Sequence, residues 1–293
     1  MINLKSYIQL FVPPIYYRAK KRLFPKKQPQ IHPLPKLEHD RQRMVVIGNG
    51  PSLIKTVELY EQQLHEADCV MVNFSARTPL FEQIKPKYYL MVDPGFINNH
   101  SIEESVRALV SDLTNKTSWP MTIIMPDSLQ SWNSCAELQT NKNISILFYN
   151  NKGGNVSKNK LYEVLDEYLV GPPAQTVLNA AIWLSVYWEY KETYIVGADT
   201  SFIQDIYVGQ ENNVLYTVDR HYYNNQEVCP EQIEPEKNGH PFGMDMEHLL
   251  DAVHTMYVDY KTLKAYAEWK GVKIYNASEY SMIDCFERKK LNE

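Results

Sequence analysis

Short apolar segments alternate with longer segments of helical spacing along most of the chain. Runs of four to seven β-branched and aromatic residues predict buried strands. These strands are expected at residues 44–47, 69–73, 88–93, 121–125, 144–149, 193–199 and 272–277. Apolar residues at helical spacing predict long helices over residues 53–64, 174–190 and 246–271.

This order of elements predicts an α/β fold. Strands that alternate with helices favour a mainly parallel sheet covered by helices on both faces. One Rossmann-like domain over residues 41–293 accounts for the pattern. The polar, tyrosine-rich residues 203–245 interrupt it and are predicted to be an insertion that acts as a lid.

Residues 1–40 differ from the rest and are predicted to be an N-terminal arm and a linker. Residues 1–27 combine bulky apolar side chains with seven lysines and arginines and no acid. Such a segment can lie in a membrane interface against anionic lipid, or pack on its own domain or on a partner subunit. Pro13 and Pro14 interrupt any helix there. Residues 28–40 are polar and proline-rich, as a linker would be.

Composition narrows the classes of protein. A net charge of −5 without a basic face argues against general nucleic-acid binding. No apolar run approaches the ~20 residues of a membrane-spanning helix. The four cysteines lie far apart, without metal-ligand spacing, which favours a reducing compartment. We therefore expect a cytoplasmic protein, with residues 1–27 as its candidate peripheral contact with the inner membrane face.

Polar side chains follow three predicted strands. Asn49, Asn73 and Asp93 each stand at a strand end. Singly, such residues are turn residues or helix caps. Because ligands of open α/β sheets bind beyond the carboxyl ends of the strands, the three together predict a crevice that binds a polar ligand.

The turn after the first strand reads GNGPS. Gly48 and Gly50 allow a close backbone approach, and Pro51 suits the first turn of the following helix. The helix amino terminus around Ser52 offers amides to an anion. The turn lacks the third glycine of the dinucleotide fingerprint and the Lys-Ser/Thr of the P-loop, which disfavours the first site and excludes the second.

Two further positions carry candidate chemistry. Asp199 closes a buried strand and could hold a ribose hydroxyl, bind a metal or cap the next turn. Tyr207 follows it, and a tyrosine hydroxyl can stabilise a phosphate leaving group. The alternative for the tyrosines of the insertion is ordinary aromatic packing; these are Tyr207, Tyr216, Tyr222 and Tyr223.

His254 lies at the margin of the apolar stripe of the last long helix. That position fits either a surface histidine or a general base, because histidine exchanges protons near neutral pH.

Several of these segments together resemble the bacterial sialyltransferases of glycosyltransferase family 42. Residues 47–53 (IGNGPSL) are similar to the A-G-N-G-P-S-L of that family, and residues 190–199 (YKETYIVGAD) to its Y-K-E-I-Y-L-x-G-x-D. Asn73 matches a strand-end asparagine. The resemblance implies a phosphate-contacting tyrosine at Tyr207 and a general-base histidine at His254.

The chain departs from that family at two positions. Asp93 stands where the family has asparagine, and Ser201 stands where it has the first of two phosphate-contacting tyrosines.

The resemblance implies a GT-A-like variant of the fold and an inverting, metal-independent transferase without a cofactor. Its donor would be a CMP-activated acidic sugar, sialic acid or a relative such as Kdo. Its acceptor would be a glycan or lipid-linked glycan of a surface polysaccharide or lipooligosaccharide. Whether the chain forms a homo-oligomer stays open. The expected nucleotide-binding residues are Gly48, Asn49, Gly50, Ser52, Asn73, Asp93, Thr176, Gly197, Asp199 and Ser201.

Two alternatives remain. GNGPS and GxD also occur in a group that resembles the 6-hydroxymethylpterin pyrophosphokinases. A Mg²⁺-dependent diphosphokinase of that type would use Asp93 and Asp199 as metal ligands. The other alternative is a non-catalytic nucleotide-binding subunit of a glycan-assembly complex.

Overall fold

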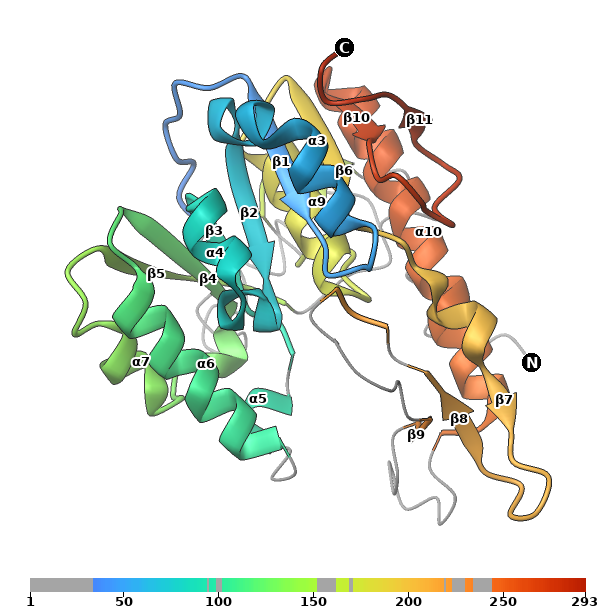
Figure 1. The fold of residues 1–293 in the computed structure, drawn as a ribbon. Helices are drawn as coiled ribbons and strands as arrows, with labels where there is room; N and C mark the ends of the chain where they lie inside the picture. Colours follow the sequence, from blue (N-terminus) through green and yellow to red (C-terminus); the bar gives the residue numbers. More distant parts are fainter. Residues whose placement is uncertain are drawn as a thin grey trace, which may run out of the picture.

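The computed structural model describes residues 34–93, 95–98, 102–151, 162–168, 171–218, 220–222, 230–233 and 244–293. Its centre is an eight-stranded sheet in which every neighbouring pair is parallel (Figure 1). In spatial order the strands are β11 (Glu287–Arg288), β10 (Lys273–Asn276), β6 (Glu192–Val196), β1 (Arg43–Ile47), β2 (Asp68–Val72), β3 (Tyr88–Leu90), β4 (Met121–Pro126) and β5 (Ile144–Tyr149). The predicted α/β, Rossmann-like class is confirmed.

The strand order of the sheet reverses between β1 and β6, which makes this pair the topological switch point. Strands β1 to β5 follow one another outward, and the chain then returns to place β6 on the free side of β1. β1 and β6 pair from Arg43 with Glu192 to Ile47 with Val196. Loops that leave two such strands diverge to opposite faces, so a crevice forms between them at their carboxyl ends.

Helices cover both faces of the sheet (Figure 1). One face carries α3 (Leu53–Glu66), α4 (Pro79–Ile84), α6 (Glu103–Lys116) and α7 (Ser134–Leu138). The other carries α8 (Tyr162–Asp166), α9 (Val177–Tyr187) and α10 (Met246–Lys270). The remaining short helices are α5 (Gly95–Asn98), η1 (Asn73–Arg77), η3 (Asp127–Leu129) and η4 (Ser201–Asp205).

Strand β1 shows why the predicted strands are apolar throughout. Met44 and Val46 belong to the core under α9, and Val45 and Ile47 belong to the core under α3. Successive side chains of a strand point to opposite faces, so a strand covered on both faces needs apolar residues at every position. Helix α9 is likewise buried almost all round, because it packs against both the sheet and α10.

The predicted strands and long helices are all present, with shifted ends. The predicted strand 193–199 stops at Val196, because Gly197 adopts a positive φ of 60° and turns the chain away from the sheet. The predicted helix 174–190 begins only at Val177, after a capping box between Thr176 and Asn179. Helix α6, which we did not predict, has a largely charged outer face and covers its sheet face with few apolar residues.

Part of the predicted linker is docked on the domain. Leu34 is buried in the core, and its carbonyl accepts a hydrogen bond of 2.9 Å from the hydroxyl of Tyr187. The ring of His39 stacks on Tyr190 at 3.8 Å between centroids. Residues 34–40 therefore pack on the domain instead of spanning free space. The predicted arm, residues 1–27, lies outside the described residues.

The insertion contains a small antiparallel sheet of β7 (Tyr207–Val208), β8 (Leu215–Thr217) and β9 (Glu231–Gln232). Much of residues 203–245, including Tyr223, lies outside the described part of the chain, and the lid role stays a prediction. Of the helices that the structure describes, none combines the length and the apolar character needed to cross a bilayer.

Asp259 on α10 makes the stability of the domain depend on pH. Its carboxylate accepts a hydrogen bond of 2.9 Å from the backbone N–H of Gln175, and burial raises its pKa to about 6. The unfolded chain releases this proton at about pH 4. Between these values the folded state binds more protons, so its free energy of unfolding falls as the pH rises. We expect a fall of roughly 1–2 kcal/mol, reduced for partial exposure of the group.

The variant Asp259→Asn tests this, because an amide oxygen still accepts the bond from Gln175 but cannot ionise. Urea titrations between about pH 4 and pH 7 should show a flatter pH dependence for this variant than for the wild type. Glu58→Gln, on the exposed side of α3, is the comparison for removing one surface carboxylate. A pH dependence equal to that of the wild type in Asp259→Asn would contradict the assignment.

Candidate functional site

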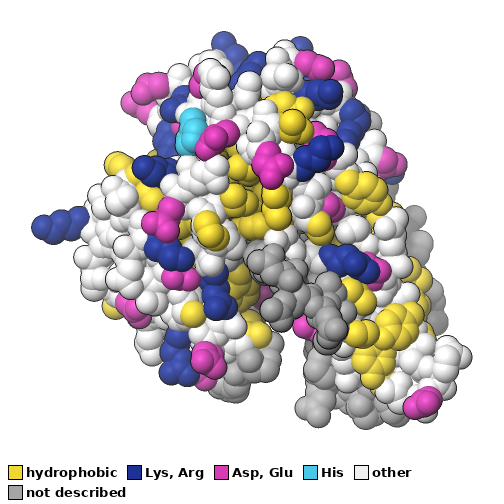
Figure 2. All heavy atoms as spheres, viewed as in Figure 1, with side chains coloured by type: hydrophobic (Ala, Val, Ile, Leu, Met, Phe, Trp, Pro, Cys, Tyr) yellow, Lys and Arg dark blue, Asp and Glu magenta, His cyan; other side chains and the backbone are white. Residues whose placement is uncertain are grey.

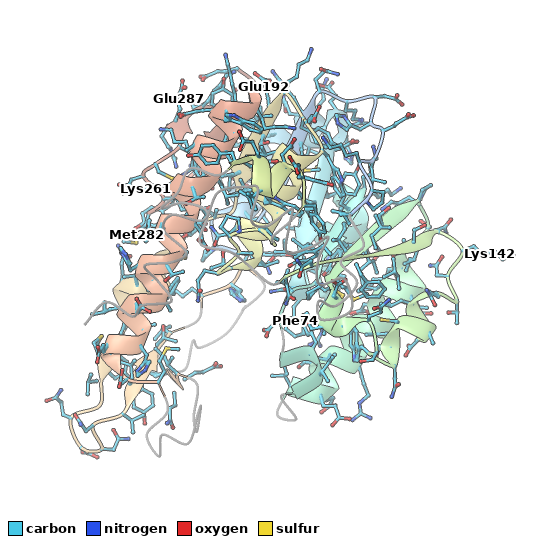
Figure 3. The ribbon with its side chains drawn as sticks, turned by 180° about the vertical axis from the view of Figure 1, so that it is seen from behind. Phe74, Lys142, Glu192, Lys261, Met282 and Glu287 are labelled. Carbon is cyan, nitrogen blue, oxygen red and sulfur yellow. The ribbon has the colours of Figure 1, made fainter. Side chains whose placement is uncertain are left out.

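A cavity of about 860 Å³ lies where the carboxyl ends of β1, β2 and β6 meet. This volume is in the range of small-molecule sites. Figure 2 shows lysine, arginine, aspartate and glutamate side chains interspersed with apolar ones over one face of the molecule. Figure 3 shows Phe74, a cavity residue, at the opposite end of the sheet from Glu192 at the start of β6. The predicted residues that line the cavity are Gly48, Asn49, Gly50, Asn73, Asp93, Thr176, Gly197, Asp199 and Ser201.

The predicted convergence of Asn49, Asn73 and Asp93 is confirmed, since all three line this cavity. The side chain of Asn49 also makes hydrogen bonds within the protein. The amide of Asn49 donates to the carbonyl of Val72 at 3.3 Å, and its oxygen accepts from the hydroxyl of Ser75 at 2.6 Å. Asn49 thereby ties the loop after β1 to the loop after β2. Contact of these side chains with a nucleotide stays a prediction.

The two glycines of the GNGPS turn pack against the end of β6 and the loop that follows it. The N–H of Gly48 donates to Val196 at 2.8 Å, and the N–H of Gly50 donates to Gly197 at 2.7 Å. A Cβ on Gly48 would lie 2.5 Å from the carbonyl oxygen of Gly197. We expected these glycines to admit a ligand to the backbone. The loop after β6 packs closely against Gly48 because β1 and β6 are adjacent strands. Gly48 and Gly50 also line the cavity, and contact of their backbone with a ligand stays a prediction.

Asp199 occupies the anion position at the amino terminus of α3. Its carboxylate accepts hydrogen bonds from the backbone N–H of Ser52 at 3.0 Å and from the Ser52 hydroxyl at 2.5 Å. Burial raises the pKa of Asp199, and the two bonds from Ser52 oppose that rise. Asp199 therefore caps α3, which lies far earlier in the chain, whereas the cap that we predict from the sequence is of the turn that follows Asp199. Ser52 does not line the cavity. Its backbone N–H, which we expect from the sequence to bind a ligand anion, donates to the Asp199 carboxylate instead.

A second helix amino terminus faces the cavity. Thr176, Val177 and Leu178, at the start of α9, all line it. In this first turn the N–H of Asn179 already donates to Thr176 in the capping box, so the N–H groups of Val177 and Leu178 are the ones that favour an anion. The buried hydroxyl of Tyr260 lies on the same wall, with Thr176 and Thr200 as hydrogen-bonding neighbours, while burial raises its pKa.

Thr200 and Asn73 both adopt left-handed backbone conformations, which threonine disfavours and asparagine tolerates better. Thr200 has a φ of 55° and Asn73 a φ of 48°, and both line the cavity. A left-handed conformation is a clear outlier for a β-branched residue such as threonine and costs of order 1–3 kcal/mol. Strain of this kind collects at functional sites, which supports the cavity as the site.

His254 and Tyr207 are not brought to the cavity. Met256 and Tyr260 lie on the face of α10 that lines the cavity. His254 lies about 200° around the helix from Met256 and is exposed to solvent. Tyr207 stacks on Tyr216 at 5.5 Å in the small sheet and is 43% exposed. The packing alternative therefore describes Tyr207, and the surface alternative describes His254.

Five charged or titratable residues that line the cavity were not among the predicted site residues: Arg77, Arg220, His221, Glu231 and Tyr260. The guanidinium of Arg220 donates to both carboxylate oxygens of Asp205, at 2.8 and 3.1 Å. No carboxylate of the described residues pairs with Arg77. The charged pair Arg220-His221 within the tyrosine-rich insertion was the available signal, but nothing in the spacing indicated that this segment returns to the sheet.

The described residues contain no group of three or more His, Cys, Asp or Glu side chains close enough together to hold a metal ion.

Comparisons with known proteins bear on the fold. No family model matches the chain, and no curated protein matches it. Among solved structures it is similar to the MAf glycosyltransferase from Magnetospirillum magneticum AMB-1, with a TM-score of 0.51 and 12% sequence identity. The match covers 98% of this chain and 40% of that one, so the chain spans less than half the length of this neighbour. At this identity, the shared property is the fold.

Proposed function

We propose that the chain is a glycosyltransferase that moves an acidic sugar, sialic acid or a relative such as Kdo, from a CMP-sugar to a glycan or lipid-linked glycan. One observation carries the proposal: six residues of the sialyltransferase-like motifs line a single cavity at the switch point of the sheet, namely Gly48, Asn49, Gly50, Asn73, Gly197 and Asp199. The glycosyltransferase neighbour with the same fold supports the reaction class.

The cavity offers three features that suit an anionic donor. Arg77 supplies a positive charge that no carboxylate of the described residues neutralises. The amino terminus of α9 and the hydroxyl of Tyr260 add neutral donors on another wall. Because Asp199 occupies the amino terminus of α3, the donor phosphate binds at α9 and Arg77 instead.

The reaction is a direct displacement at the anomeric carbon with inversion. The acceptor hydroxyl loses its proton to a base as its oxygen attacks, and the bond to the CMP phosphate breaks. Arginine and helix-terminal amides stabilise the departing phosphate without a metal ion. Strand-end residues Asn49, Asn73 and Asp93, which line the cavity, hold the nucleotide, and the lid excludes water from the anomeric carbon.

Thermal unfolding in the presence of CMP, UMP, GDP or ATP, each with and without Mg²⁺, tests the ligand class. We expect CMP alone to raise the Tm, by roughly 5 °C when CMP is at about 100 times its Kd, with no requirement for Mg²⁺. A radiometric transfer assay with CMP-activated sialic acid and Kdo then tests turnover. The absence of turnover with either donor and a panel of glycan acceptors would contradict the transferase.

A diphosphokinase is the second candidate, because Asp93 and Asp199 both line the cavity. It predicts a Tm increase with ATP that requires Mg²⁺, and activity that EDTA abolishes. A non-catalytic subunit predicts the CMP shift without turnover.

Arg77 provides a mutational test of the donor site. We expect Arg77→Ala to raise the Kd for the CMP-sugar roughly 10–100-fold, since a hydrogen bond to a charged group contributes about 1.5–3 kcal/mol. Arg77→Lys should keep part of the affinity, because lysine keeps the positive charge, but it should lose the bidentate hydrogen bonding of arginine to the donor phosphate. Isothermal titration calorimetry measures the change.

The matched control is Arg107→Ala on α6, an exposed arginine that lies near Glu103 and outside the cavity. Equal affinities of Arg77→Ala and Arg107→Ala would show that Arg77 does not contact the donor.

A further inference from the structure

Residues 220–222 form a short segment of the insertion that is anchored at both ends beside the cavity. On one side Arg220 makes its two hydrogen bonds to Asp205 in η4, which follows β6. On the other side the N–H of Tyr222 donates to the carbonyl of Asn49 at 3.0 Å. The buried hydroxyl of Tyr222 lies 2.8 Å from that of Thr78.

These anchors join different parts of the site. Asp205 belongs to the β6 side of the cavity, whereas Asn49 and Thr78 belong to the β1 and β2 sides. The segment therefore bridges the two halves of the cavity wall. His221 stands between the two anchored residues and lines the cavity. It is held by a backbone hydrogen bond of Tyr222 on one side and by the side-chain ion pair of Arg220 on the other, which limits the movement of a side chain that must meet a reacting atom.

His221 is the one histidine among the described residues that line the cavity. The other titratable or charged lining residues are Arg77, Asp93, Asp199, Arg220, Glu231 and Tyr260. Asp199 caps α3 through Ser52, and Arg220 is paired with Asp205. A neutral imidazole accepts a proton near neutral pH more readily than a tyrosine hydroxyl or an ionised arginine.

We infer that His221 is the general base of the transfer reaction, an assignment that rests on the proposed function. The imidazole nitrogen that carries no proton takes the proton from the acceptor hydroxyl. The acceptor oxygen forms its bond to the anomeric carbon, and the bond from that carbon to the phosphate oxygen breaks. The electron pair leaves with CMP, and the imidazolium then returns its proton to solvent. Tyr222 and the Arg220–Asp205 pair position the ring.

The experiment compares His221→Ala, His221→Asn and His254→Ala in the full chain with a CMP-sugar and a glycan acceptor. Both His221 variants should lower kcat by ~10²–10⁴-fold and keep the Tm increase with CMP. His254→Ala, on the exposed side of α10, should transfer at the rate of the wild type. The retained CMP response separates loss of chemistry from loss of folding.

Two further readouts distinguish a base from a structural residue. A base must be unprotonated to act, so the kcat/KM of the wild type should fall as the pH is lowered, and this limb should disappear in His221→Ala. Free imidazole should restore part of the rate of His221→Gly and leave His254→Gly unchanged. Tyr222→Phe, which removes only the hydroxyl that contacts Thr78, should lower kcat less than His221→Ala does.

The outcomes separate the two proposals. If the wild type transfers sugar and His221→Ala does so at a near-normal rate, the role of His221 is wrong and the proposed function stands. The role of His221 is also wrong if His254→Ala, and not His221→Ala, loses the rate and the acid limb. If the wild type transfers no sugar from any CMP donor, the proposed function fails and the role of His221 fails with it.

Discussion

The contact between the loops that follow β1 and β6 is the constraint on which the cavity depends. Two backbone hydrogen bonds, from Gly48 and Gly50, hold these loops together, and the Asp199 carboxylate joins the β6 loop to the start of α3. Hydrogen bonds to a charged group contribute about 1.5–3 kcal/mol each, and they offset part of the cost of burying the carboxylate, whose pKa stays raised. This contact fixes the two loops that leave the central strands of the switch point.

That contact also decides where charge is available to a ligand. The Asp199 carboxylate accepts a hydrogen bond from the N–H of Ser52 at the amino terminus of α3. The GNGPS turn, which resembles a phosphate-binding turn, therefore connects the loops after β1 and β6. The remaining features that favour an anion are Arg77 and the start of α9, on other walls of the cavity. The donor site of the proposed transferase is therefore displaced from the glycine turn, although both belong to the same cavity.

Two different parts of the chain form the walls of the cavity, the strand ends of the sheet and the insertion. The strand ends form one part, where the hydrogen bonds of Asn49 and the left-handed backbone of Asn73 fix side-chain positions. The insertion forms another part through residues 220–222, which Tyr222 fastens to the loop that carries Asn49. One asparagine thus links the β1 loop to β2 through its side chain and to the insertion through its carbonyl. This shared anchor explains how a segment so far along the chain becomes part of a site at the first strand.

The sequence by itself determined the α/β class, the strands and long helices, and the meeting of Asn49, Asn73 and Asp93. These follow from local periodicity and from the rule that parallel strands end at one edge. Only the tertiary structure decided which partner each group met. It turned Gly48 toward Gly197 and Ser52 toward Asp199, placed His254 on the outer side of α10, and brought His221 to the cavity. Such contacts depend on strand order and on the path of the insertion, and the local sequence around each residue encodes neither.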